Sequence, residues 1–268
     1  MLDDVVRPTA DAVATAAPAF ELANPDGAAR ALLICDHASR FVPPEYNALG
    51  LDDSLLQRHI AWDIGAADVT RRLAGLLDAP AVLCGTSRLV VDCNRPHDDP
   101  SLIPAVSDGI VIPGNGDVDA AEKRRRIERH FIPYHREVER RLDQFAARGI
   151  VPAVISVHSF TPVMNGFERP WHVGLLSAVD RRMAAPLVDE LRRNPALTVG
   201  DNEPYTGDDP RGYAIHVYGH VRGLPMAVFE VRQDLIDTHH GAESWAHILF
   251  AALRPVLADA DLYRLEPK

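Results

Sequence analysis

The chain has 268 residues, of which 47% are hydrophobic, and its formal net charge is -10. This length and apolar content suit one sizeable core, whereas the negative charge disfavours binding to nucleic acid or to an anionic membrane. No apolar run approaches the ~18 residues needed to span a bilayer, and the acidic start of the chain lacks the basic residues of a signal peptide, so we expect a cytoplasmic protein without a membrane partner.

No Ser/Gly-rich linker divides the chain, so we expect a poorly defined N-terminal arm over 1–25 and a single α/β domain over 26–268. In the first half of this domain, short apolar runs and helical spacing of apolar residues mark the elements. We predict strands over 30–35, 81–84 and 89–93, helices over 52–58 and 61–77, and a loop over 96–117. A loop of this length within a compact domain is often functional.

A charged helical segment opens the second half, and Pro133 should break or kink it because proline lacks an amide hydrogen. We predict helices over 122–148, 180–193, 213–221 and 242–258, and strands over 151–157, 171–176, 197–199 and 226–231. Strands that alternate with helices imply a sheet covered on both faces. The predicted fold class is therefore α/β, with three α/β/α layers around a mixed, largely parallel central sheet.

Three apolar runs end abruptly in polar side chains. The first ends in Asp36-His37, the second in His158-Ser159 and the third in Glu230. Ligands gather at the carboxyl ends of such strands in α/β proteins, and neutral imidazole is a common zinc ligand. A histidine at a strand end can instead cap a turn. Two of them together with a carboxylate nevertheless indicate a hydrolytic centre that holds one divalent metal ion.

A catalytic zinc site uses three protein ligands, so a carboxylate should accompany the two histidines. Asp63 opens a predicted helix, and Glu45 follows a Pro-Pro turn. For Asp63 the alternative is a helix N-cap, a role that aspartate fills well. For Glu45 the alternative is an exposed loop residue, so both candidates stay open at this point.

Glu230 interrupts an apolar run and should not be buried unpaired. It could pair with Arg232, because positions two apart on a strand share a face. Both side chains could also point into one site. In that case Glu230 would act as a general base that takes a proton from water.

Arginine side chains offer sites for an acidic molecule. Arg88 and Asn94-Arg95 flank a short apolar run, and arginine binds carboxylates through a planar fork. The alternative is a surface arginine paired with Asp92 or Asp98. Further predicted substrate-binding residues are Arg169, Tyr205, Arg232 and Ser159.

Short motifs for other chemistries are missing from the sequence. It contains no HExxH zinc helix, no GxSxG elbow, no P-loop and no GxGxxG. Cys35, Cys84 and Cys93 form no CxxC pair, so a thiolate zinc site is not expected. We expect each cysteine to behave as a small buried hydrophobic residue.

In their joint order, these segments resemble the N-formylglutamate amidohydrolase family. The resemblance spans about residues 30–240 and rests on segments 36–39, 62–63, 87–96, 133–135, 158–162, 202–205, 223–225 and 230–236. The family is similar to the zinc carboxypeptidases in fold and site layout. The resemblance implies zinc at His37 and His158, a substrate carboxylate bound by Asn94 and Arg95, and Glu230 as the base.

This chain departs from those patterns at two positions. The carboxypeptidase HxxE pattern would place glutamate where this chain has Arg40. We therefore take Asp63 as the third metal ligand, because Trp62-Asp63 belongs to the amidohydrolase pattern, and keep Glu45 in reserve. The second departure is Asp36, where many family members carry proline, and it points to a branch with a different substrate.

The resemblance implies a metal-dependent amidohydrolase that cleaves a small anionic N-acyl amino acid, first of all N-formyl-L-glutamate, to formate and glutamate. Arg88 or Arg95 would stabilise the oxyanion or clamp a carboxylate. One alternative keeps the site and changes the substrate to another N-acyl amino acid or a short peptide, as Asp36 suggests. Another is a non-enzymatic protein that binds small molecules on the same scaffold. The sequence leaves metal identity and oligomeric state open.

Overall fold

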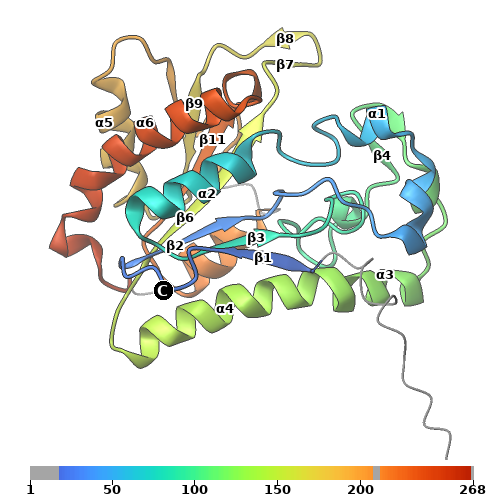
Figure 1. Cartoon of the computed structure of the whole chain (residues 1–268), viewed down its shortest axis with the longest axis horizontal. Coiled ribbons are helices and arrows are strands. Elements are labelled where there is room, and N and C mark those ends of the chain that lie inside the picture. Colours follow the sequence, from blue (N-terminus) through green and yellow to red (C-terminus); the bar gives the residue numbers. More distant parts are fainter. Residues whose placement is uncertain (1–17, 208–211, 267–268) are drawn as a thin grey trace, which may run out of the picture.

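The structure, a computed structural model, describes residues 18–207 and 212–266 and is built around a seven-stranded sheet (Figure 1). The strands, in sheet order, are β1 (Phe20–Ala23), β3 (Ala81–Cys84), β2 (Ala31–Cys35), β6 (Ala153–Phe160), β11 (Met226–Arg232), β9 (Val173–Leu176) and β10 (Val199–Asp201). Strands β3, β2, β6 and β11 run parallel, so their carboxyl ends meet at one edge. Strand β1 is antiparallel to β3, and β9 is antiparallel to β11. The predicted mixed, largely parallel sheet is confirmed.

Helices cover both faces of this sheet, as Figure 1 shows. The helices are α1 (Asp53–Leu56), α2 (Ala66–Leu77), α3 (Ala120–Arg126), α4 (Ile132–Ala147), α5 (Ala184–Arg192) and α6 (His239–Leu257). Helices α2, α5 and α6 pack on one face, while α4 and the π-helical segment η6 (Ile215–Val221) pack on the other. The central strands are buried on both faces, which is why they appear in the sequence as continuous apolar runs. The predicted three-layer α/β/α fold is confirmed.

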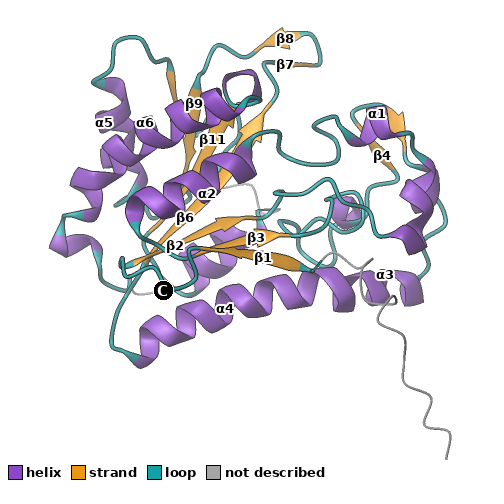
Figure 2. Cartoon of the chain, in the orientation of Figure 1, coloured by secondary structure: helices purple, strands orange, loops and turns teal. Residues whose placement is uncertain are grey.

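A third, smaller core lies beneath the loops around α1. It contains Leu49 and Ile60 and reaches the short hairpin β4–β5 (Val106–Ser107, Ile110–Val111). In Figure 2 long teal loops fill the side of the molecule where α1 and β4 lie. A second hairpin, β7–β8 (Val163–Met164, Phe167–Glu168), follows β6. The loop side therefore has its own hydrophobic support.

The predicted strand over 89–93 is wrong. Leu89 and Val90 are fully buried, but the segment is a series of turns, with Val90 N donating to Ser87 O over 2.9 Å. Its apolar side chains fill the smaller core and the α4 side of the main core, so they are buried without belonging to a sheet. At the break or kink predicted near Pro133 the helix does not stop: a π-helical turn over Ile127–Phe131 lies between α3 and α4, and the backbone stays helical throughout.

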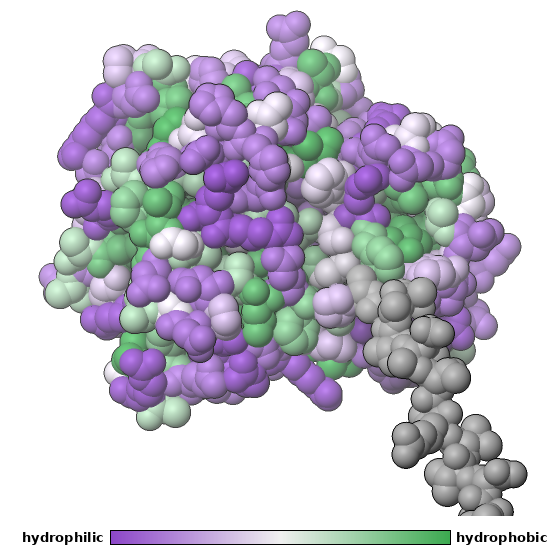
Figure 3. All heavy atoms as spheres, in the orientation of Figure 1, coloured by the Kyte–Doolittle hydropathy of each residue, from purple (hydrophilic) through white to green (hydrophobic). Residues whose placement is uncertain are grey.

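Residues 1–17 of the predicted N-terminal arm lie outside the described residues, and the domain boundary stays a prediction. Residues 20–23 form the edge strand β1. All three cysteines are free and buried, as expected. Within the described ranges no helix is long and apolar enough to cross a membrane, and the cytoplasmic location stays a prediction. On the face in Figure 3 hydrophilic residues predominate and the hydrophobic ones are scattered in small groups.

Candidate functional site

Three polar side chains stand in a row across neighbouring strands. Glu230 on β11 is the register partner of His158 on β6. Ile34 on β2 is the partner of Ser156, so Asp36, two residues further and directly after β2, lies level with His158. Alternation along each strand places all three on the face covered by α4. The sheet register itself thus brings two carboxylates to either side of one imidazole.

A buried His-Asp-His cluster lies at this edge of the sheet. The ligand-type atoms of His37, Asp63 and His158 all lie within 4.8 Å of one another. Asp63 Oδ2 is 2.8 Å from His158 Nδ1 and 3.4 Å from His37 Nδ1. His37 Nδ1 is buried and has no hydrogen-bond partner among the described residues. Two imidazole nitrogens and a carboxylate oxygen are donors suited to zinc, so the residues present fit the predicted metal ion.

Asp63 lies in a tightly packed segment just before α2, and its side chain points into the cluster. The helix begins after Gly65, which has φ +80° and no side-chain cap, so the N-cap alternative for Asp63 is wrong. A Cβ at position 65 would clash with the backbone of Ile236. Asp63 N donates to His37 O over 3.0 Å. Burial alone would raise the pKa of Asp63, but the two histidines hold it well below its usual range.

Each histidine has a second carboxylate on its far side. His37 Nε2 is 2.7 Å from Asp92 Oδ1, and Arg88 pairs with Asp92 at 2.7 Å and with Asp63 at 3.4 Å. His158 Nε2 is 3.3 Å from Asp36 Oδ2. Burial alone would lower the pKa of His158, but the carboxylates of Asp36 and Asp63 hold it well above its ordinary value. The pairing of Arg88 with Asp92, considered from the sequence, is therefore present inside the site.

Glu230 is buried beside this cluster. It is 7% exposed, and its Oε2 atom has no hydrogen-bond partner among the described residues. Burial raises its pKa to about 7, although the nearby histidines oppose the shift. A carboxyl group that titrates near neutrality can both accept and return a proton. Its predicted partner Arg232 instead pairs with Asp234 at 2.8 Å.

Arg169 is a buried cation without a carboxylate partner among the described residues. It is 8% exposed, and its Nη1 donates to Tyr205 OH over 3.1 Å. The same nitrogen lies 3.4 Å from the hydroxyl and carbonyl oxygens of Thr161, at the end of β6. Charges on Glu230 and Asp63 raise the pKa of Tyr205 after the larger effect of burial. Arg169 and Tyr205 therefore lie beside the metal-type cluster and offer donors to an anion.

The remaining predicted residues have other contacts. Asn94 Oδ1 accepts from Ala214 N over 3.0 Å, and Arg95 donates to Asn94 O and Ser101 Oγ. Ser159 Oγ donates to Ile64 O over 2.9 Å, which fixes the segment carrying Asp63. The reserve ligand Glu45 is about half exposed, pairs with Arg129 at 3.4 Å, and does not join the cluster.

Three residues of the site were not identified as such from the sequence: Asp36, Asp92 and Tyr134. Tyr134, on α4, donates to Asp36 Oδ1 over 2.7 Å. A signal was present, because Asp36 directly precedes His37 and Tyr134 lies within the matching segment 133–135. Neither feature indicates that the two side chains meet across 98 positions of chain.

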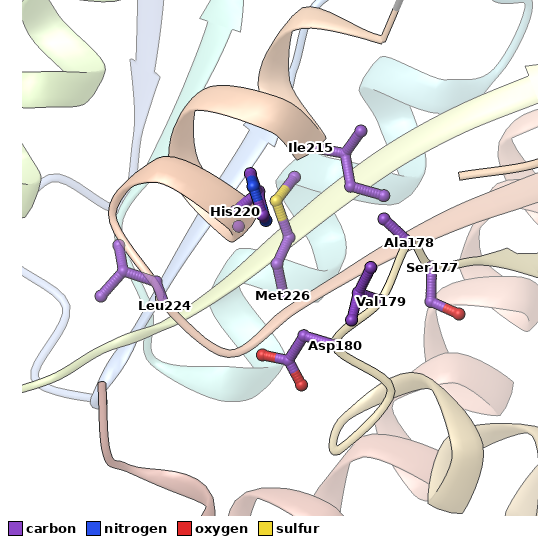
Figure 4. Close-up of a pocket in the computed structure, with 9 residues that line it drawn as sticks. Ser177, Ala178, Val179, Asp180, Ile215, His220, Leu224 and Met226 are labelled. Carbon is purple, nitrogen blue, oxygen red and sulfur yellow. The ribbon is translucent and has the colours of Figure 1, made fainter. Parts of the chain in front are cut away.

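A small cavity lies elsewhere in the molecule. Figure 4 shows it between η6 and the loop before α5, lined by residues that include Ser177, Asp180 and His220. Its volume is about 20 Å³, which is room for roughly one water molecule. Because it contains neither Glu230 nor the clustered histidines, it is not the candidate site.

Comparisons with known proteins identify relatives. The sequence matches the family model N-formylglutamate amidohydrolase over residues 29–237. A solved structure of gene product Atu2144 from Agrobacterium tumefaciens is 34% identical, with a TM-score of 0.87, covering 90% of this chain and 95% of that one. N-formylglutamate amidohydrolase from Ralstonia eutropha JMP134 is 20% identical, with a TM-score of 0.65, covering 90% and 97%. No curated protein matches the sequence.

Proposed function

Since the chain belongs to the N-formylglutamate amidohydrolase family and is therefore a hydrolase acting on an amide, we propose that it cleaves a small anionic N-acyl amino acid. The first candidate is N-formyl-L-glutamate, with formate and glutamate as products. The observation that carries the proposal is the buried cluster of His37, Asp63 and His158 directly beside Glu230. Family membership favours this enzyme over the non-enzymatic binding protein considered from the sequence.

His37, Asp63 and His158 would hold one zinc ion. Zinc in such a site lowers the pKa of a water molecule toward ~7 and polarises a carbonyl group. Asp92 and Arg88 support this arrangement, because Asp92 fixes His37 and Arg88 binds both Asp92 and Asp63. Arg88 is partly exposed and so is also available to stabilise negative charge on the carbonyl oxygen.

Glu230 moves the proton in this proposal. Its Oε2, which has no hydrogen-bond partner in the described part of the chain, takes a proton from the attacking water and passes it to the departing amine nitrogen. A pKa of about 7 suits both transfers at neutral pH. Because the same proton is taken up and then returned, one buried carboxylate on β11 is enough for both transfers.

Arg169 and Tyr205 would bind a carboxylate of the substrate. Arg169 is a nearly buried cation whose described neighbours supply no counter-charge, and such a charge is costly unless an anion pairs with it. Asn94 and Arg95 remain candidates for the second carboxylate of N-formylglutamate. Arg232 is paired with Asp234, and Ser159 fixes the segment that carries Asp63 through its bond to Ile64 O, so neither is assigned to the substrate.

The test measures zinc content and formate release on the purified protein. Glu230→Gln should keep its zinc and lose roughly 10²–10⁴-fold in kcat. Glu45→Gln is the matched control, because Glu45 sits in a surface ion pair, and it should retain both zinc and activity. An active Glu230→Gln variant would contradict the assignment of the base.

Substrate choice is decided by a panel of N-acyl amino acids and short peptides. N-formylglutamate should give the highest kcat/KM, because two carboxylates can each find an arginine. Preference for a longer acyl group or for an uncharged amino acid would replace N-formylglutamate by the alternative substrate that Asp36 first suggested.

A further inference from the structure

The two histidines of the candidate metal site have equivalent surroundings. His37 Nε2 faces Asp92 at 2.7 Å, which leaves Nδ1 directed toward Asp63. His158 Nδ1 faces Asp63 at 2.8 Å, and its Nε2 faces Asp36 at 3.3 Å. In both cases one ring nitrogen faces the cluster centre and the other faces a carboxylate outside it.

Asp36 is held in place on its other side. It is 1% exposed, and its Oδ1 accepts a hydrogen bond of 2.7 Å from Tyr134 OH. Its Oδ2 and the Nε2 of His158 are both buried and have no hydrogen-bond partner among the described residues other than this mutual approach. Two atoms of complementary charge, each otherwise unsatisfied, therefore lie opposite one another.

We propose that Asp36 is a positioning residue for the metal site. Its Oδ2 accepts the Nε2–H of His158, which fixes the imidazole tautomer and leaves the Nδ1 lone pair facing Asp63 and the metal position. Carboxylates that hold a ligating histidine in this way orient the ring and raise its basicity. The inference rests on the proposed metal site but not on the identity of the substrate.

The arrangement also connects the site to a helix. Tyr134 lies in the first turn of α4 and is fully buried, so the path Tyr134–Asp36–His158 runs from the α4 core into the cluster. Asp36 does not act as a fourth ligand in this assignment, because its nearest cluster atom is the His158 nitrogen that faces away from Asp63.

The experiment measures the zinc dissociation constant of the full-length protein by competition with a chromogenic chelator. Asp36→Ala should weaken zinc binding by roughly 10–100-fold. Asp36→Asn should restore part of the loss, because an amide oxygen can still accept from Nε2–H. The visible absorption of the cobalt-loaded Asp36→Ala protein should also change, because a freed imidazole no longer holds one orientation.

Asp108→Asn is the matched control. Asp108 lies 3.4 Å from His59 Nε2 in another His-Asp pair and otherwise pairs with Arg58, not with a ligand-type residue of the cluster, and its substitution should leave the zinc dissociation constant unchanged. Should Asp36→Ala fail to fold by circular dichroism, Asp36→Asn and Tyr134→Phe carry the test, and each should weaken zinc binding to a smaller degree. Wild-type affinity in all folded Asp36 and Tyr134 variants would overturn the proposal.

The outcomes for Asp36 and for the proposed function are separable. A wild-type protein that binds zinc and loses it on Asp36 substitution, yet hydrolyses no N-acyl amino acid, supports the role of Asp36 and contradicts the proposed substrate. A wild-type protein that binds no zinc under saturating conditions contradicts the metal site and the role of Asp36 together.

Discussion

At the scale of single residues, the candidate site contains two buried carboxyl groups, Glu230 and Asp63, whose pKa values shift in opposite directions. Burial moves the pKa of Glu230 up to about 7, whereas the histidines keep that of Asp63 well below its usual range. The pKa values of the two carboxyl groups differ because Asp63 lies between the imidazoles of two histidines, whereas Glu230 has one histidine as its register partner on the neighbouring strand. Neighbouring carboxyl groups with divergent pKa values are typical of sites that divide acid-base work between them.

The raised pKa of Glu230 predicts a pH-dependent loss of stability. The unfolded chain releases this proton near pH 4.5 and the folded protein near pH 7. Between those values the folded state holds more protons, so its free energy of unfolding falls as the pH rises. In metal-free protein, Glu230→Gln should therefore be more stable than wild type by up to about 3 kcal/mol at pH 8 and similar to it at pH 4.

Urea unfolding at both pH values, with a chelator present, measures this difference. Glu45→Gln is the control for the loss of a glutamate at the surface, because Glu45 is about half exposed and pairs with Arg129. Equal stability of wild type and Glu230→Gln at pH 8 would mean that Glu230 is not destabilised by its burial.

Arg169 predicts a selective effect on substrate binding. Arg169→Met removes the buried cation that Tyr205 supports. A hydrogen bond to a charged group contributes about 1.5–3 kcal/mol, so KM for N-formylglutamate should rise by roughly 10–100-fold with a smaller change in kcat. If Arg169 binds the side-chain carboxylate, steady-state kinetics with N-formylglutamine, which lacks that carboxylate and keeps the α-carboxylate, should show little effect.

Arg232→Met is the control for the arginine, because Arg232 is already paired with Asp234. Its KM for N-formylglutamate should stay near the wild-type value. If Arg169→Met affects both substrates alike, Arg169 does not recognise the side-chain carboxylate of N-formylglutamate.

At the scale of elements, strands were predictable where a buried apolar run ended in a polar residue. The runs that lead to His37, His158 and Glu230 are β2, β6 and β11, and the site lies at their ends. The run 89–93 has the same apolar character but packs beneath a loop, and composition alone does not distinguish a sheet from a buried turn. Asp63 was uncertain for a related reason, since its role depends on a turn set by contacts with the distant Ile236.

That turn gives a prediction for the element that carries Asp63. Gly65 has a left-handed backbone and no room for a Cβ. Gly65→Ala should destabilise the protein by at least about 1–2 kcal/mol from the backbone alone and should weaken zinc binding, because Asp63 lies two residues earlier. Thermal unfolding and chelator competition measure the two effects.

Gly75→Ala is the matched control within the same helix. Gly75 is exposed in α2, and a Cβ there meets nothing within 4 Å. It should raise stability by about 0.5–1 kcal/mol and leave zinc affinity unchanged. A tolerated Gly65→Ala would show that the segment before α2 can adjust.

At the scale of the whole molecule, the three layers could be predicted from the alternation of strands and helices in the sequence. The arrangement of the outermost strands of the sheet could not be predicted in this way. Two hydrophobic cores cover the sheet, and the loop side is supported by a third. The buried cluster lies where these loops meet the sheet, so a ligand there should stabilise the folded protein as a unit. The ligand binds the native state and not the unfolded chain, so its binding shifts the folding equilibrium toward the native state.

Zinc should therefore raise the melting temperature. At a free zinc concentration a thousandfold above the dissociation constant, the gain is about 4 kcal/mol, or roughly 10 °C for a protein of this size. Asp63→Asn keeps the shape of the side chain and removes its charge, so its melting temperature should not respond to zinc. Differential scanning calorimetry measures both, and an equal response of Asp63→Asn would place the stabilising ion elsewhere.

The row of Asp36, His158 and Glu230 has a consequence for how this enzyme can change under selection. The separation of the three residues is set by adjacent strands, roughly 4.8 Å apart in any sheet, and not by loop conformation. Arg169 and Tyr205, in contrast, belong to loops that follow β8 and β10. Mutational libraries confined to those loops can therefore explore substrates with other acidic groups while Asp36, His158 and the proposed base Glu230 keep their spacing.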